Sequence, residues 1–144
     1  MQAPESSNPG IVGSTPGDGL LLILSNLPDR ETAHGIAHAL VHERLAACVN
    51  VLDGCTSVYR WQGQVEQADE VTLLVKTTRQ RHAACQQRLK ALHPYEVPEI
   101  VTLAPEAVWP AYAQWAVAAT RDAVAGTPGP TGVTHDAAGG RSEG

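Results

Sequence analysis

Two long strand-like segments that meet at a tight turn constrain the fold of this chain more than any other feature. The first segment covers 46–52 and 56–61, with a break at Asp53-Gly54, and the second covers 65–77. Gln62-Gly63-Gln64 lies between them, and its glycine can supply the positive φ that tight hairpin turns require. The two segments therefore predict an extended antiparallel hairpin. Its distal half is expected to project beyond a domain of this size.

Further strands and helices are predicted on either side of the hairpin. The aliphatic run 20–24 predicts a strand buried on both faces, because it is short, continuous and followed by turn residues. An amphipathic helix is expected over 30–46, with Asp29 as its N-cap. The other expected elements are a helix over 79–92 with Thr78 as N-cap, a fourth strand over 99–104 and a final helix over 109–124.

The order of these elements, β-α-β-β-α-β-α, predicts the fold class. Apart from the last helix, it is the order of an α+β, ferredoxin-like βαββαβ sandwich, in which helices cover one face of an antiparallel sheet. We place this domain at 19–124. The segments 1–18 and 125–144 are rich in small and polar residues, so they are expected to be disordered tails.

Charge and composition argue against nucleic acid and membranes as partners and indicate a cellular location. The formal net charge is −5, and 20–124 holds 11 acidic and 9 basic residues with no basic stripe, which argues against nucleic acid. The N-terminus lacks the pattern of a signal peptide, and the longest aliphatic run is too short to span a membrane. The three cysteines form no C-x-x-C pair, so we expect a reducing, cytoplasmic location.

Four sequence blocks resemble those of the CutA divalent-cation-tolerance proteins. They are Ala47-Cys48-Val49-Asn50, Ser57-Val58-Tyr59-Arg60-Trp61-Gln62-Gly63, Lys76-Thr77-Thr78 and His93-Pro94-Tyr95-Glu96-Val97-Pro98-Glu99-Ile100. The resemblance covers about 20–120 and implies a ferredoxin-like homotrimer, similar in architecture to PII-like signalling proteins, whose long hairpins pair between subunits. It also implies a role in tolerance of copper and other divalent metals.

The copper site assigned in this family is only partly retained in this chain. Carried over by resemblance, its positions are Ser25, Leu92 and His93. A serine hydroxyl is a poor copper ligand and leucine is none. Cu²⁺ or another divalent ion therefore stays the expected cofactor with His93 as its one retained ligand, and no organic cofactor is indicated.

The proline-rich segment 93–100 allows two interpretations. Its polar side chains could converge on a metal ion or a small anion between subunits, or the segment could be a rigid staple of the subunit interface. The residues concerned are His93, Tyr95, Glu96 and Glu99, together with Trp61. Arg60 and Lys76 could pair with the two carboxylates, or they could line an anion pocket.

Other candidate metal ligands lie outside this segment. Cys48 could bind a soft metal or act as a small hydrophobic side chain in its strand. His34, His38 and His42 recur every four residues, so they could chelate a divalent ion or form a solvated helix face.

The sequence contains no nucleophile elbow, P-loop or H-E-x-x-H motif, so an enzyme is not expected. The favoured function is that of a trimeric protein that binds divalent metal ions in the response to metal. The alternatives are a PII-like sensor of a small anionic ligand and a structural trimer that acts through protein partners.

Overall fold

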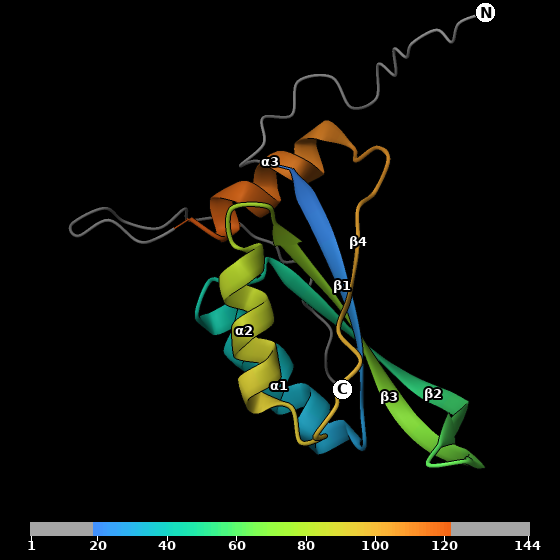
Figure 1. The fold of residues 1–144 in the computed structure, drawn as a ribbon. Helices are drawn as coiled ribbons and strands as arrows, with labels where there is room; N and C mark the ends of the chain where they lie inside the picture. The colour runs from blue at the N-terminus through green and yellow to red at the C-terminus, as the bar shows by residue number, and fades with distance from the viewer. Residues whose placement is uncertain (1–18, 122–144) are drawn as a thin grey trace, which may run out of the picture.

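A four-stranded antiparallel sheet with strand order β2-β3-β1-β4 organises the domain (Figure 1). The computed structural model describes residues 19–121, so both predicted tails lie outside the described residues. The elements are β1 Leu20–Leu27, α1 Arg30–His42, β2 Cys48–Trp61, β3 Gln64–Thr78, α2 His82–Leu92, β4 Val101–Leu103 and α3 Pro110–Ala119. The predicted ferredoxin-like arrangement is confirmed, with α3 added after β4.

The long hairpin forms as predicted. β2 and β3 pair from Cys48↔Lys76 to Trp61↔Gln64, with a register shift between Leu52 and Cys55. Gln62 and Gly63 turn the chain with φ values of 51° and 82°, the two positive values typical of a twist-compatible hairpin turn. The distal parts of both strands project away from the helices at the lower right of Figure 1.

The main core lies between one face of the sheet and the helices α1 and α2. Alternate residues of β1 and β3 point to this face, since successive side chains of a strand point to opposite sides. The core side chains with no exposed surface include Ile23, Leu27, Leu40, Leu73, Val75 and Leu89. Burial of these aliphatic side chains fixes the register of the central strands.

Within the single chain, the prediction that the first strand is buried on both faces is met on one face only. Leu22 and Leu24 point away from the main core and are only half-buried. α3 covers only the start of this second face, where Ala116 and Tyr112 pack near Leu20. The sequence run could not reveal this, because hydrophobicity alone does not say what covers each face of a strand.

The limits of the first two helices differ from the prediction. The first helix ends at His42 rather than residue 46, because Arg44 adopts a left-handed φ of 62°. The second begins at His82, because the Thr78 hydroxyl accepts a bond from the Arg81 amide and closes a separate turn first.

The C-terminal elements are also shorter than predicted. The fourth strand pairs only over Val101–Leu103, and α3 ends at Ala119, followed by Thr120, whose hydroxyl bonds back to the Ala116 carbonyl. Residues 122–124 of the predicted helix lie outside the described residues. Among residues 19–121, no helix is long and apolar enough to cross a membrane.

Candidate functional site

An open groove lies between the segment 93–99, which we call the corner, and the projecting hairpin. Its volume is about 720 Å³, and we call it the corner groove. Its lining residues come from β1, β2, β3 and the corner: Asn26, Ser57, Val58, Tyr59, Trp61, Glu70, Pro94, Tyr95, Glu96, Val97 and Glu99. Segments far apart in the sequence therefore build one concave surface.

Backbone stiffness places the corner against the end of β1. α2 ends at Leu92, and His93 is already extended, with φ −75° and ψ 132°, as expected of a residue that precedes proline. Pro94 and Pro98 fix their own φ angles and cannot donate backbone hydrogen bonds. The corner consequently depends on side-chain bonds to the sheet for its position.

His93 provides the first of these anchors. The side chain is buried, its Nε2 donates to the Asn26 carbonyl at 2.9 Å, and its Nδ1 accepts from the Tyr95 amide at 3.2 Å. Because the carbonyl only accepts and the amide only donates, the imidazole is neutral with its proton on Nε2. Burial lowers the pKa of His93, which agrees with this neutral form.

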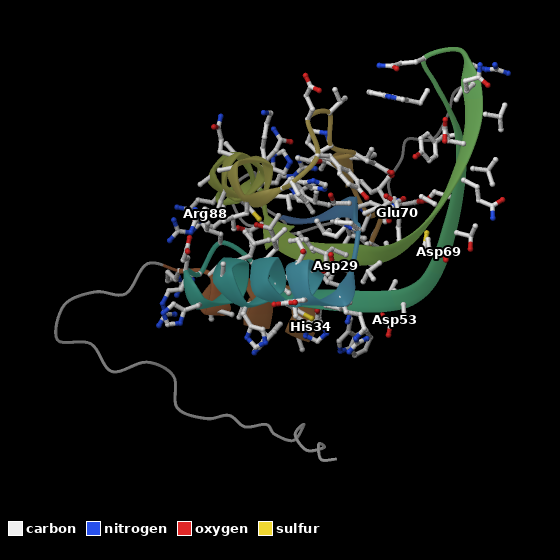
Figure 2. The ribbon with its side chains drawn as sticks, turned by 90° about the horizontal axis from the view of Figure 1, so that it is seen from below. Asp29, His34, Asp53, Asp69, Glu70 and Arg88 are labelled. Carbon is white, nitrogen blue, oxygen red and sulfur yellow. The ribbon has the colours of Figure 1, made fainter. Side chains whose placement is uncertain are left out.

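Glu70 connects the corner to the hairpin. The Tyr95 hydroxyl donates to Oε2 at 2.8 Å, and the Ser57 hydroxyl donates to Oε1 at 2.6 Å. Burial, and then the hydrogen bond to Glu70, raise the pKa of Tyr95, so its hydroxyl stays a donor. In Figure 2, Glu70 lies on β3 near the point where the hairpin leaves the body of the domain.

The end of β1 holds the other end of the corner. The buried Ser25 hydroxyl donates to the Glu99 carbonyl at 2.7 Å, and Asn26 Nδ2 donates to Glu99 Oε1 at 3.1 Å. Asn26 Oδ1 in turn accepts from the Thr72 hydroxyl at 2.6 Å. The sequence interpretation missed Asn26 and Glu70. The signal that could have identified Asn26 is its position as a polar residue just after the aliphatic run 20–24.

The structure brings together Trp61, Tyr95, Glu96 and Glu99, all of which line the corner groove. It does not bring Arg60 or Lys76 there. Arg60 Nη1 lies 3.5 Å from the Gly63 carbonyl at the hairpin turn. Within one chain, therefore, neither cation pairs with the corner carboxylates.

Lys76 lies near the opposite end of the hairpin. Its Nζ donates to Asn50 Oδ1 and lies 3.9 Å from the sulfur of Cys48. Cys48 is half-buried and also contacts Tyr112, whose pKa is raised by burial and then by the neighbouring thiol. Its contacts with Lys76 and Tyr112 are those of a side chain packed within the domain. A role of Cys48 as a metal ligand stays a prediction.

The copper site implied by the resemblance does not fit these residues. Ser25 uses its hydroxyl on the Glu99 carbonyl, Leu92 has no donor atom, and both ring nitrogens of His93 are hydrogen-bonded. Within 19–121, no three His, Cys, Asp or Glu side chains are grouped closely enough to hold a metal ion.

The electrostatic character of the corner groove is negative. Glu70, Glu96 and Glu99 line it, and none of its lining residues is a lysine or arginine. Glu96 and Glu99 are exposed, and Glu96 has no hydrogen-bond or ion-pair partner among residues 19–121. This lining attracts cations and hydrogen-bond donors and repels small anions.

Comparison with known proteins gives one family. The family model of the CutA1 divalent ion tolerance protein matches residues 21–119. The divalent-cation tolerance protein CutA of Thermus thermophilus is 56% identical over 82 residues, which are 57% of this chain and 80% of that protein.

Solved structures agree with this match. CutA from Xylella fastidiosa aligns with a TM-score of 0.69 and 42% identity over 71% of this chain and 98% of its own. A CutA from Archaeoglobus fulgidus, described as a periplasmic divalent cation tolerance protein, aligns with a TM-score of 0.68 and 30% identity over 71% of this chain and 99% of its own.

Proposed function

The chain belongs to the CutA1 divalent ion tolerance family, which is not a known enzyme family, and on that premise we propose that it is a homotrimer that binds divalent metal ions. Cu²⁺ is included among these ions, and the proposed role is in the response to metal. The negative lining of the corner groove is the observation that carries the metal-binding part. The open face of the sheet supports the trimer.

The face of the sheet opposite α1 and α2 is largely uncovered, and on it a group of aliphatic side chains lies beside Asn50, Thr72 and Lys76. By strand register, aliphatic side chains of all four strands point to it: Leu22, Leu24, Leu52, Leu74, Val101 and Leu103. Leu52, Val101 and Leu103 are 49%, 44% and 46% exposed. Burying the exposed half of such a side chain contributes roughly 1 kcal/mol. A contiguous apolar surface of this kind is typical of an interface between subunits.

The edge strand β2 supports the same assembly. It is 14 residues long and, among residues 19–121, pairs only with β3, so its outer edge presents backbone donors and acceptors that no described strand pairs with. Such an edge is normally covered or paired in native proteins. Pairing between hairpins of neighbouring subunits would satisfy it.

Light scattering on the full chain tests the trimer. We expect three times the chain mass of 15.2 kDa. Leu74→Lys should disrupt the assembly, because it places a charge in the proposed interface. Val41→Lys is the matched control, since Val41 is an exposed aliphatic residue of α1 on the other side of the sheet. A monomeric wild-type protein would contradict the trimer.

Calorimetric titration with Cu²⁺ and Zn²⁺ tests metal binding. Glu96→Gln and Glu99→Gln should each weaken the binding of ions held in the corner groove, because each removes one negative charge. Failure to bind any divalent ion more tightly than roughly millimolar, about −4 kcal/mol, would rule out direct metal binding.

The negative groove opposes the alternative of a small anionic ligand at this site. A thermal-shift screen of nucleotides and organic acids should accordingly leave the melting temperature unchanged. We further propose a cytoplasmic location, supported by the three free cysteines. Cell fractionation tests it, and recovery of the protein outside the cytoplasm would refute it.

A further inference from the structure

We propose that His34 and His38 form a two-imidazole site for a borderline divalent ion, Cu²⁺, Ni²⁺ or Zn²⁺, on the outer side of α1. The proposal deepens the proposed function, since it names a site for such an ion, and this site is separate from the corner groove. The two rings are stacked, with centroids 6.4 Å apart and an interplanar angle of 30°. Imidazole nitrogen suits these three ions better than carboxylate oxygen does.

The helix holds both imidazoles in place before any ion arrives. Residues i and i+4 lie above one another on a helix, and the opposite side of α1 is anchored in the core by Ala33, Ile36 and Leu40. His34 is half-buried and His38 is exposed, so both rings are accessible at the rim of the domain. After the first nitrogen binds, the second is already nearby, which is the source of the chelate advantage.

The distance between the rings is close to that needed for a shared ion. A metal–nitrogen bond is about 2.0–2.1 Å long and a ring nitrogen lies roughly 1.1 Å from the ring centroid, so two rings on one ion have centroids roughly 4.5–5.3 Å apart when the N–metal–N angle is about 90–110°. The observed 6.4 Å is roughly 1–2 Å longer than this spacing, so one ring has to move toward the other when the ion binds. Rotation about the first side-chain torsion of the exposed His38 moves its ring toward His34 and closes the difference, and rotation about the second torsion then turns a nitrogen toward the ion.

Arg30 shows which atom of His34 would bind the ion. The Arg30 Nη2 lies 3.2 Å from His34 Nε2, and since a guanidinium only donates, this nitrogen presents its lone pair. Arg30 also forms an ion pair with Asp53 of β2. Figure 2 shows His34 and Asp53 side by side along the lower edge of the domain.

The guanidinium therefore occupies a position between an imidazole lone pair and a carboxylate. A divalent ion at His34 has to compete with this cation, both for the lone pair and through charge repulsion. If the ion displaces Arg30, the Asp53 carboxylate is left close by as a negative neighbour. Arg30 is thus expected to weaken metal binding, in contrast to the two histidines.

The site stays accessible in the proposed trimer. α1, which carries both histidines, packs on one face of the sheet through Ile36 and Leu40, whereas the proposed interface uses the other face and the outer edge of β2. Each subunit would therefore contribute one complete site, without residues from its neighbours.

Calorimetric titration of the full chain with Ni²⁺ at pH 7.5 tests the proposal. His135→Gln is introduced in every sample, so that this imidazole, which lies outside the described residues, does not contribute. We expect His34→Gln and His38→Gln each to weaken binding by roughly tenfold or more, because each removes one of two chelating nitrogens. We expect Arg30→Gln to tighten binding by about threefold, since it removes a competing positive charge.

His42→Gln is the matched control. His42 lies four residues after His38. Among the described residues, however, His38 stacks on His34 and no ring contact joins it to His42. Its substitution should change the affinity by less than about twofold, as expected for a surface residue outside the site. Equal unfolding curves of all variants without metal ensure that the fold is intact.

Zn²⁺ followed by NMR gives a second readout. The imidazole resonances of His34 and His38 should shift together during the titration, while those of the half-buried His82 and the buried His93 should not. Unchanged Ni²⁺ affinity in the His34→Gln, His38→Gln double variant would overturn this site and leave the proposed function intact. Absence of any divalent-metal binding by the wild-type chain would overturn both. Weaker binding by Arg30→Gln would refute the assigned geometry.

Discussion

Replacing Tyr95 with phenylalanine tests the bond that joins the corner to the hairpin. The Tyr95 hydroxyl donates to Glu70 Oε2 at 2.8 Å, and the other oxygen of Glu70 accepts from Ser57. Phenylalanine keeps the aromatic ring and its contact with His93, whose centroid is 5.0 Å away. The substitution therefore removes one hydrogen bond and little packing.

The structure suggests the size of the effect. A hydrogen bond to an ionised group contributes about 1.5–3 kcal/mol to stability. Glu70 faces an open groove, so water can replace the lost donor, and the lower end of this range applies. We expect Tyr95→Phe to lower the free energy of unfolding by about 1.5 kcal/mol, a roughly tenfold change in the unfolding equilibrium.

Denaturation with guanidinium chloride measures this change. All variants are compared at one protein concentration, because the stability of an oligomer depends on concentration. Tyr59→Phe is the control: Tyr59 lines the same groove, is 44% exposed and has no hydrogen-bond partner for its hydroxyl among residues 19–121. Its effect should stay within about 0.5 kcal/mol. Equal losses in the two variants would refute the role assigned to Glu70.

Three further changes probe other parts of the fold. Gly63→Ala forces a side chain into a φ of 82° and should cost about 1–2 kcal/mol, measured by denaturant unfolding; no loss would contradict the turn geometry. Leu89→Ala should cost about 2–5 kcal/mol because the side chain has no exposed surface in the core, and a loss below about 1 kcal/mol by the same assay would contradict that packing. Burial lowers the pKa of His93 below its ordinary value of 6.5, so the unfolded state binds more protons in mildly acidic solution. Its contribution to stability should be complete above pH 6.5 and decline as the pH falls below it, and His93→Gln should flatten that decline in unfolding curves; an unchanged slope would refute it.

Local features of the fold were predictable because short-range chemistry determines them. Asp29 caps α1 by accepting from the Thr32 amide at 2.8 Å, as expected of an aspartate before a helix. Gly63 marked the hairpin turn for a similar reason, since few other residues tolerate its backbone angles.

The candidate site depended on long-range contacts, which a single sequence does not reveal. Tyr95 and Glu99 were identified as polar corner residues, but their partners Glu70 and Asn26 lie 25 and 73 positions away along the chain. The partners of Lys76 within the chain could not be predicted from the sequence for the same reason. Its strand continues toward the corner groove, yet its side chain lies beside Cys48 near the other end.

The central place of β1 has a consequence for how the chain folds during synthesis. β1 is translated first among the strands, yet Leu22 pairs with Lys76 on one side and with Leu103 on the other. Until those later segments leave the ribosome, an aliphatic strand stands with both edges unpaired. Such segments are prone to association with other chains, and pairings this distant slow folding. We therefore expect nascent chains that stop before β3 to depend on chaperones, and release of that dependence once β4 has been made.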